Sequence, residues 1–342
     1  MRIRRPFDAH LHLRDGDMLH AVLPETARHC DRALVMPNLT PPVTRREHAQ
    51  AYKRRIAAAT PAGTGFEPLL TAYLTDDADP DELIAGFEAG DWVAAKLYPA
   101  HATTNSSHGV TDIARIEPAL RAMAAAGMPL CVHGEVTDPE IDIFDREAVF
   151  LATVLAPMLE RLPELRVVVE HATTAAAVQF VAAAGDGVGM SITAHHLWWN
   201  RNALFAGGLR PHAYCLPVLK RESDRRALVD IATSGHPRVF FGTDSAPHLV
   251  HRKETDCGCA GVFSATNAVS AVATVFEREG ALEHLEAFLS LNGPGFYRRA
   301  PSDRFIEIDA EPSTSAAALP TPEGEVRIFL GGEALPFTAR AI

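Results

Sequence analysis

The stretch Pro6-Phe7-Asp8-Ala9-His10-Leu11-His12-Leu13-Arg14 carries two histidines separated by a single leucine. In a β-strand, successive side chains point to opposite faces, so the two histidines would lie on one side and Ala9, Leu11 and Leu13 on the other. Two imidazoles side by side at a strand end can bind one metal ion. The alternative is a pair of polar residues on a solvated edge strand, and the rest of the chain decides between them.

The length and composition describe an ordinary soluble globular protein. The chain has 342 residues, enough for one large α/β barrel or two ordinary domains, with 47% hydrophobic and 22% charged residues. The formal net charge of -11 would repel nucleic acid, and no basic patch is concentrated locally, so we expect no nucleic-acid partner. A small anionic substrate is still compatible, because one buried arginine can hold it.

The sequence also predicts the compartment. No run approaches 18 apolar residues, and no apolar segment follows the basic start Met1-Arg2-Ile3-Arg4-Arg5, so we expect no membrane span, no signal peptide and a cytoplasmic location. Five cysteines, an odd number scattered over a long chain, favour reduced thiols over a disulfide framework.

Short apolar, β-branched runs alternate with alanine- and leucine-rich helical segments. We predict strands at Phe7 to Leu11, Ala33 to Met36, Pro68 to Leu74, Val93 to Leu97, Pro129 to Val132, Arg166 to Glu170, Gly189 to Thr193 and Val239 to Gly242. We expect helices at Arg45 to Ala59, Ile113 to Ala126, Arg146 to Arg161, Ala175 to Ala184 and Ser223 to Ser234. Eight alternations over about 290 residues predict an α/β protein with a (β/α)8 TIM barrel. A doubly wound open sheet would instead place a glycine-rich phosphate turn after its first strand, where this chain has histidines.

The end of the chain differs in composition. Two further helices, near Asn267 to Glu277 and Leu282 to Leu291, would complete a barrel domain over residues 1–300. Residues 301–342 would form an appended strand pair packed on the barrel, with strands at Arg304 to Ile308 and Glu325 to Phe329. A segment rich in Pro, Ser, Thr and Ala, residues 311–322, separates them, and the tail could be partly disordered.

Polar residues fall where the predicted strands end. A single histidine after a strand is more often structural, but several at the same end of successive strands are hard to obtain by chance. Active sites of such barrels lie at the carboxyl ends of the strands. The residues concerned are His10 and His12, Asn38, Lys96, His133, His171, His195 and His196, and Asp244.

The donor types favour zinc. Five protein ligands are too many for one catalytic zinc that keeps an open position, so two metal ions with a bridge between them are the simpler interpretation. Lys96 ends an apolar strand, where burial disfavours the ammonium form, and a neutral amine can add carbon dioxide to become an anionic bridging carbamate. The alternative is a barrel lysine paired with an acid. The proposed ligands are His10, His12, His133, His171 and Asp244.

Such a centre would activate water and polarise a carbonyl, while Asp244 could move the proton to the leaving nitrogen, which amounts to hydrolysis at a carbonyl or its reverse. Arg14 follows His12 by two residues, so its planar guanidinium could hold a substrate carboxylate with help from Asn38 and His248. The alternatives are a surface arginine and an asparagine that only forms a turn.

Three further features have weaker interpretations. The polar loop of residues 101–109 follows a strand directly and could be a lid over the substrate, or an ordinary solvated loop. His195 and His196 are more simply supporting or packing residues than ligands. Cys257 and Cys259 lack the partners of a structural zinc site, so we expect free thiols near the active site.

Several motifs together resemble one known family, the dihydroorotases of the amidohydrolase superfamily, in the compact single-function form found in bacteria. The resemblance extends over essentially the whole chain to Asn292-Gly293-Pro294. It rests on Asp8-Ala9-His10-Leu11-His12-Leu13-Arg14, Met36-Pro37-Asn38, Lys96-Leu97-Tyr98-Pro99, Val132-His133-Gly134-Glu135, Glu170-His171, Gly242-Thr243-Asp244-Ser245-Ala246-Pro247-His248 and Cys257-Gly258-Cys259-Ala260-Gly261.

The resemblance implies a binuclear zinc barrel that interconverts N-carbamoyl-L-aspartate and L-dihydroorotate in pyrimidine biosynthesis, commonly as a homodimer. By motif position, one zinc would be held by His10, His12 and Asp244, the other by His133 and His171, with N6-carboxylated Lys96 bridging them and Asp244 as the acid/base. Arg14, Asn38 and His248 would bind the substrate carboxylate. Backbone at Leu216 and around Ala260 would meet the ring amides, and Thr103 and Thr104 match the family's mobile loop.

Two rival functions stay open. A hydantoin- or allantoin-hydrolysing enzyme of the same superfamily would share the metals and differ in the carboxylate-binding set of Arg14, Asn38 and His248. A non-catalytic barrel that binds a partner protein would have lost ligands, and none is lost here.

Overall fold

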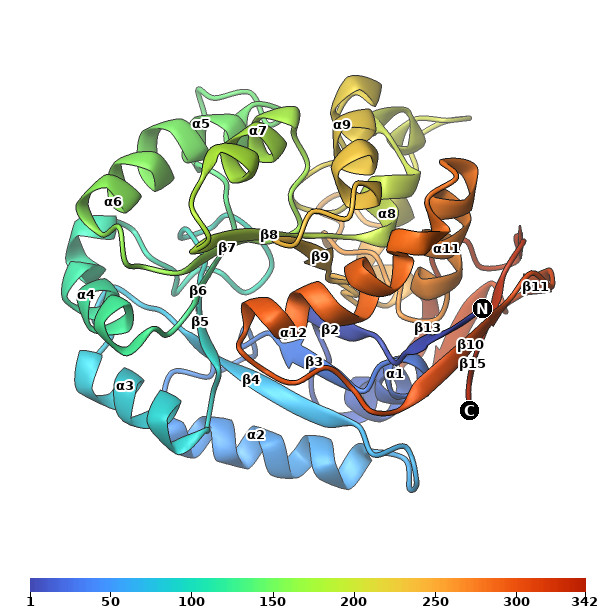
Figure 1. Ribbon diagram of the computed structural model, residues 1–342, viewed down its shortest axis with the longest axis horizontal. Helices are drawn as coiled ribbons and strands as arrows, with labels where there is room; N and C mark the ends of the chain where they lie inside the picture. The colour runs from blue at the N-terminus through green and yellow to red at the C-terminus, as the bar shows by residue number, and fades with distance from the viewer.

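The computed structural model describes all 342 residues and contains the predicted barrel of eight parallel strands (Figure 1). The strands follow chain order around the barrel, and their bounds differ from the predicted ranges by at most one residue at either end. They are β2 (Phe7–Leu11), β3 (Arg32–Val35), β4 (Glu67–Tyr73), β5 (Ala94–Leu97), β6 (Leu130–Val132), β7 (Val167–Val169), β8 (Val188–Ile192) and β9 (Val239–Phe241).

The barrel closes between β2 and the segment that follows β9. Leu11 forms a parallel bridge with Ser245, and the Asp244 amide donates to the His10 carbonyl at 2.9 Å. Because parallel strands run in the same direction, all eight carboxyl ends lie at one end of the barrel. Closure therefore brings the histidine pair and Asp244, which are far apart in the chain, next to each other.

The first barrel strand is not a regular ribbon. Its pairing with β3 shifts register between Asp8 and Leu11. Ala9 consequently packs inside the barrel, whereas Leu11 and Leu13 pack in the apolar layer between the strands and the outer helices. The expectation that Ala9 shares a face with these leucines is wrong, because an irregularity re-aims the side chains that follow it. The two histidines do lie on one side, as predicted, with their Nε2 atoms 3.2 Å apart.

Helices surround the strands (Figure 1). The predicted helix over residues 146–161 is one continuous run whose middle, Leu151–Leu155, is wound as a π-helix. None of the helices combines the length and apolar composition that a bilayer-spanning segment needs. The α-helices are α1 (Gly16–His29), α2 (Arg46–Ala59), α3 (Pro80–Ala89), α4 (Glu117–Ala126), α5 (Arg146–Phe150), α6 (Ala156–Arg161), α7 (Ala175–Ala183), α8 (Ala194–Trp198), α9 (Glu222–Thr233), α10 (Val250–Lys253), α11 (Ala268–Arg278) and α12 (Asn292–Phe296).

Short helical turns complete the connections. The 3-10 turns are η1 (Ile113–Ile116), η3 (Arg201–Leu204), η4 (Pro211–Ala213) and η5 (Leu282–His284), and the second π-helix is η6 (Ala287–Leu291). Both ends of α3 follow ordinary capping rules. Asp79 accepts a hydrogen bond from the Asp81 amide at the start of α3, where Pro80 occupies the first turn, and Gly90 ends that helix with φ of 75°.

The lower part of the barrel interior is filled with apolar side chains. Phe7 and Ala9 of β2 meet Phe240 of β9 there, and Phe296 with Tyr297, at the end of α12, pack against them. An interior packed in this way has no room for a ligand at its amino-terminal end. Space for chemistry is left at the carboxyl ends of the strands.

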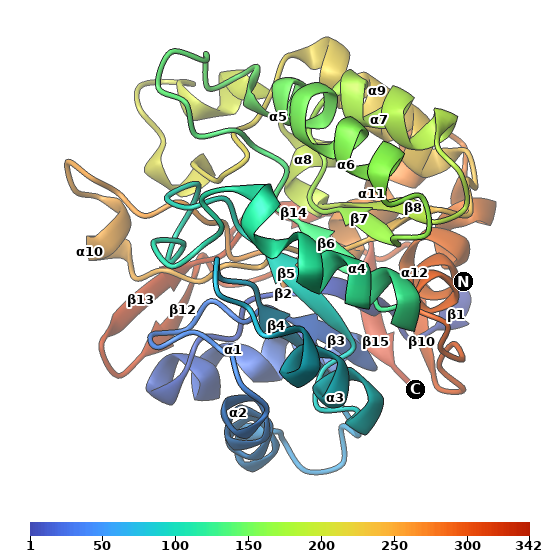
Figure 2. The same cartoon turned by 90° about the vertical axis from the view of Figure 1, so that its left-hand side faces the viewer.

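The carboxy-terminal tail forms three small antiparallel sheets, and the expected strand pair is wrong in its pairing. The two predicted strands do not pair with each other, because the first of them lies between the start and the end of the chain and pairs with both (Figure 1). The sheets are β1 (Arg2–Arg4) with β10 (Phe305–Asp309) and β15 (Thr338–Ala341), β11 (Ser313–Thr314) with β14 (Ala334–Leu335), and β12 (Ala318–Thr321) with β13 (Gly324–Arg327). The β12–β13 hairpin lies beside α10 at the opposite end of the molecule from both termini (Figure 2).

Barrel closure gives a stability prediction. The Thr243 hydroxyl donates to the buried Asp8 carboxylate at 2.6 Å, and the Thr243 amide donates to the same carboxylate at 2.8 Å. We expect Thr243→Val to lower the free energy of unfolding by about 2 to 3 kcal/mol, because a buried carboxylate loses a donor. Urea denaturation measures this loss.

The matched control is Thr153→Val, which removes an exposed helical hydroxyl that donates to the Val149 carbonyl. It should change the free energy of unfolding by no more than about 0.5 kcal/mol. Equal effects of the two substitutions would contradict the importance assigned to the Asp8 contact.

Candidate active site

Above the apolar floor, two charged side chains face each other inside the barrel. Lys96 of β5 lies two residues beyond the interior residue Ala94, and Glu170 lies two residues beyond Val168 of β7, so strand alternation turns both inward. They form an ion pair and are fully buried. Burial alone would raise the pKa of the Glu170 carboxyl, but His10 and Lys96 outweigh it and hold that pKa below its ordinary value. The unmodified Lys96 side chain therefore pairs with an acid, which is the alternative that the sequence analysis left open for it.

The predicted ligands His10, His12 and Asp244 converge at the strand ends. Asp244 Oδ1 lies 3.1 Å from His12 Nε2 and 3.4 Å from His10 Nε2. A second group of candidate ligand atoms comes from His10, Glu170 and His171. The sequence analysis did not select Glu170 as a site residue, although it directly precedes His171.

Hydrogen bonds around the cluster fix where the histidine protons lie. The Thr104 carbonyl can only accept, so the Asn38 amide nitrogen, 3.1 Å away, must donate to it. The Asn38 oxygen then faces His12 Nδ1 at 2.9 Å, and this nitrogen must carry the ring proton. His10 Nδ1 lies 3.0 Å from Glu170 Oε1, a contact of opposite polarity without hydrogen-bond geometry. The Nε2 atom of His12 is therefore left as an acceptor.

The Nε2 atoms of His10 and His12 and the Asp244 carboxylate thus face one another within 3.4 Å. Two imidazole Nε2 atoms and a carboxylate oxygen form a donor set that suits a divalent zinc-like cation. Burial lowers the pKa of His12 to about 4, so its ring is neutral near pH 7, the form that binds metals. Burial alone would raise the pKa of Asp244, but His10, His12 and His171 hold it well below its usual range. The residues present fit a bound cation.

The other two predicted ligands continue the row of imidazoles. The rings of His10 and His171 are 4.9 Å apart between centroids, as are those of His171 and His133. His171 Nδ1 is buried without any hydrogen-bond partner, which leaves a coordination position unused. His133 Nε2 instead contacts Glu135 Oε2 at 2.8 Å. Glu135 stands in the motif around His133, but the sequence analysis gave it no role.

Backbone strain gathers at this end of the barrel. Arg14, His171 and Asp244 adopt positive φ values of 58°, 42° and 41°. Residues other than glycine rarely take this conformation, and it persists where surrounding structure enforces it. Here the amide of His171 is held by Ser191 Oγ and that of Asp244 by the His10 carbonyl. These contacts aim both side chains into the site.

A narrow cavity opens over the cluster. It is lined by eleven of the thirteen residues predicted for the site, namely His10, His12, Arg14, Asn38, Thr103, Thr104, His133, His171, Leu216, Asp244 and Ala260. The remaining two lie just behind its wall. Lys96 Nζ is 4.8 Å from the ring centre of Tyr98, which lines the cavity, and His248 Nε2 is 3.1 Å from Arg14 Nη2.

The sequence analysis missed three lining residues, Tyr98, Ala246 and Gly261. Tyr98 follows Lys96 by two residues, so its place in the same motif was the available signal. Neither His195 nor His196 lines the cavity, and both are buried, where their nitrogen atoms lie close enough to Cys215 to form a further group of candidate metal ligands. His196 is bonded through Thr193 Oγ1 and the Pro217 carbonyl, whereas both ring nitrogens of His195 lack partners.

Arg14 lines the cavity, and His248 contacts it from behind the wall. Burial, and then the Arg14 guanidinium, lowers the pKa of His248 to about 2, so its ring is neutral and accepts from Arg14. A guanidinium whose neighbour is a neutral ring keeps its positive charge uncompensated there. This charge is available to a carboxylate ligand.

The loop of residues 101–109 folds over the cavity and is held from within. Ser106 is buried, and its hydroxyl donates to the Thr103 carbonyl at 2.6 Å while accepting from the Thr103 amide at 2.9 Å. Thr104 reaches across to the Ala260 carbonyl at 3.4 Å. The loop therefore forms an internally bonded unit that contacts the far wall of the site.

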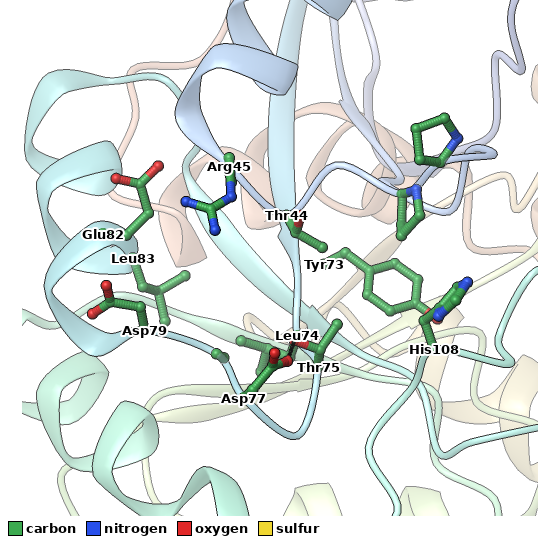
Figure 3. A pocket seen from close by; sticks show the side chains of 13 residues that line it. Thr44, Arg45, Tyr73, Leu74, Thr75, Asp77, Asp79, Glu82, Leu83 and His108 are labelled. Atoms are coloured by element: carbon green, nitrogen blue, oxygen red, sulfur yellow. Dashed lines mark hydrogen bonds between the residues drawn. The ribbon is translucent and has the colours of Figure 1, made fainter.

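A larger hollow lies outside this cluster, between the loops that precede α2 and α3 (Figure 3). His108 of the 101–109 loop faces Asp79 and Glu82 across it. Its acids already have partners, because Asp79 caps α3 and Glu82 accepts from the Arg46 amide. None of the clusters of candidate metal ligands lies in this hollow, so the histidine-lined cavity is the candidate active site.

Together these features define a class of protein, a (β/α)8 barrel with a histidine-rich cluster of candidate metal ligands at the carboxyl ends of its strands. A model of the amidohydrolase family matches residues 7–300. A dihydroorotase of Cupriavidus taiwanensis is 56% identical over 340 residues, which cover 99% of this chain and 99% of that protein.

Solved structures agree with the sequence match. The crystal structure of a Saccharomyces cerevisiae dihydroorotase, in complex with 5-fluoroorotic acid, superposes with a TM-score of 0.92 at 30% identity, covering 99% of this chain and 98% of that one. A Campylobacter jejuni dihydroorotase superposes with a TM-score of 0.91 at 34% identity, covering 99% and 97%. The chain belongs to the amidohydrolase family, and within that family to the dihydroorotases.

The bonding of Ser106 predicts how the loop behaves. Ser106→Ala removes two hydrogen bonds of roughly 0.5 to 1.5 kcal/mol each, so amides of residues 101–109 should exchange with solvent roughly tenfold faster or more. Hydrogen exchange with mass spectrometry reads this out. The neighbouring Ser107 is exposed, and Ser107→Ala should match the unsubstituted protein. Identical exchange in both variants would show that Ser106 does not hold the loop.

Proposed function

We propose that the protein interconverts N-carbamoyl-L-aspartate and L-dihydroorotate, a step of pyrimidine biosynthesis. The proposal rests on one observation above all: His10, His12, His171 and Asp244 converge in one buried cluster below the cationic Arg14. Membership of the dihydroorotases supports the same reaction.

The metal centre is part of this proposal. Two zinc ions would be held by His10, His12 and Asp244 on one side and His133 and His171 on the other. Lys96, carboxylated by carbon dioxide, would bridge them, and Glu170 would then be left to hold the His10 ring through Nδ1. When bound, the zinc ions supply a polarised carbonyl and a water of lowered pKa.

Asp244 would move the proton. In the hydrolytic direction, water adds to the ring carbonyl and the bond between that carbon and the ring nitrogen breaks. The Asp244 carboxylate takes a proton from the water and gives it to the leaving nitrogen. In the other direction the ureido nitrogen attacks the side-chain carboxyl group of N-carbamoyl-L-aspartate and water is lost. The buried position of Asp244 next to His12 keeps its oxygen directed at the reacting centre.

The substrate's remaining carboxylate would bind at the rim. Arg14 offers a planar pair of donors, His248 lies 3.1 Å from it, and the Asn38 amide lines the same cavity. Backbone groups at Leu216 and Ala260 would meet the ring amides. Thr103 and Thr104 would close over the substrate and exclude water.

The oligomeric state and the cellular location of the enzyme are also proposals. We propose a homodimer and a cytoplasmic location, as the family resemblance and the composition suggest. The five cysteines, none of which pairs with another, are compatible with a reducing compartment.

The substrate preference of an Arg14 variant tests the proposed binding of the substrate carboxylate. Arg14→Met should lower kcat/KM for dihydroorotate by about 2 to 4 kcal/mol in transition-state binding, because the substrate carboxylate loses a half-buried charged partner. The control Arg121→Met removes an exposed arginine of α4 that pairs with Glu117, and should leave turnover unchanged. Hydantoin and allantoin are assayed beside dihydroorotate. Little effect of Arg14→Met, or faster turnover of a ring that has no carboxylate, would remove the substrate assignment.

The dependence of recovered activity on carbon dioxide tests the proposed Lys96 carbamate bridge. Metal-free protein reloaded with zinc in carbon-dioxide-free buffer should regain little activity, and added bicarbonate should restore it, because the Lys96 carbamate cannot form without it. Sodium chloride at the same ionic strength is the control. Equal recovery with and without bicarbonate would mean that Lys96 stays an ordinary lysine paired with Glu170.

A further inference from the structure

One buried cation near the cavity has no part in the chemistry described so far. Lys253, the last residue of α10, is 4% exposed and does not line the cavity. Its ammonium donates to three backbone carbonyls, those of Tyr214 at 3.1 Å, Cys259 at 2.8 Å and Gly261 at 2.6 Å. Three acceptors match the three protons of an ammonium group.

These carbonyls belong to two separate loops that form one wall of the cavity. Leu216 follows Tyr214 by two residues, and Ala260 lies between Cys259 and Gly261. The loops also meet directly, because the Gly261 amide donates to the Tyr214 carbonyl at 3.0 Å. The Lys253 ammonium therefore joins both halves of the wall at a single atom.

The groups around Lys253 include no carboxylate that could pair with its ammonium. The titratable and charged groups that influence it are the thiols of Cys215 and Cys259, the Arg14 guanidinium, and the imidazoles of His195 and His248. None of them is a carboxylate, so the three carbonyl dipoles are what stabilise the buried charge.

We propose that Lys253 is a positioning residue, which holds the loops of Leu216 and Ala260 in the arrangement that receives the ring of the substrate. This inference rests on the proposed function and extends it to a residue that touches no substrate atom. Loss of the charge would let the two loops separate while the metal cluster stays intact, so substrate binding would weaken more than turnover.

Burial lowers the pKa of Lys253 to about 8. Below that pH the ammonium bonds all three carbonyls, and above it the neutral amine has only two protons for three acceptors. The KM for dihydroorotate should therefore rise as the pH passes above about 8. Lys253→Arg keeps its charge throughout, so its KM should stay flat over the same range.

The test compares Lys253→Met with Lys253→Arg, using the zinc-loaded protein and dihydroorotate. We expect Lys253→Met to raise KM by about tenfold with kcat within about twofold, and Lys253→Arg to restore most of the loss. The control Lys53→Met alters a lysine on the exposed face of α2 and should leave KM unchanged. An unchanged KM in Lys253→Met, or equal losses in KM and kcat, would overturn the proposal.

Two further readouts keep the inference separate from the proposed function. If Lys253→Met does not fold, the pH profiles of the unsubstituted protein and Lys253→Arg decide, and profiles that rise together overturn the inference. If the unsubstituted protein does not act on dihydroorotate, the proposed function fails, and hydrogen exchange still tests the wall. In that case the amides of residues 214–216 and 259–261 should exchange faster in Lys253→Met, and unchanged exchange contradicts the role.

Discussion

The Asp8 carboxylate ties the first barrel strand to the segment that follows the last one. Both of its oxygens accept hydrogen bonds from Thr243, one from the amide and one from the hydroxyl, and one of them also accepts from the amide of His10. A fully buried carboxylate is stable in such a place only when donors surround it. The contact therefore sets the distance between the histidine pair and Asp244, and the geometry of the site depends on it.

The rest of the site depends on how the ring nitrogens of His10 and His12 face the Asp244 carboxylate. Asn38 holds the Nδ1 side of His12, which turns the lone pair of its Nε2 atom toward the Asp244 carboxylate, and Glu170 Oε1 lies 3.0 Å from Nδ1 of His10. Without a cation this arrangement repels itself, and with one it becomes a ligand set. The loops around it are held by specific contacts, since Ser106 bonds the 101–109 loop internally and Lys253 joins the two halves of the opposite wall.

The sequence predicted the barrel and most of the residues that line its cavity, because both depend on short-range patterns. Strands buried on both faces read as apolar runs, and polar residues directly after them meet wherever parallel strands end. What could not be predicted depends on partners far along the chain. The irregularity in β2 reverses the face of Ala9, and the tail strand β10 pairs with residues 2–4, more than 300 positions away. The division into residues 1–300 and 301–342 stays a prediction.

The difference between short-range patterns and long-range contacts also explains which site residues the sequence analysis missed. Tyr98, Glu135 and Glu170 stand in the motifs that signalled neighbouring residues, but their contacts with Lys96, His133 and His10 appear once the strands are side by side. Lys253 gave no signal in the sequence, because a lysine after a short helix is usually exposed.

The most direct test of the central claim is the number of zinc ions bound to the purified protein, measured by inductively coupled plasma mass spectrometry with X-ray absorption of the bound metal. If barrel closure assembles a binuclear cluster of histidine and carboxylate ligands, the protein binds two zinc ions per chain with nitrogen and oxygen neighbours only. One zinc ion or none, or sulfur among the ligands, would contradict the account.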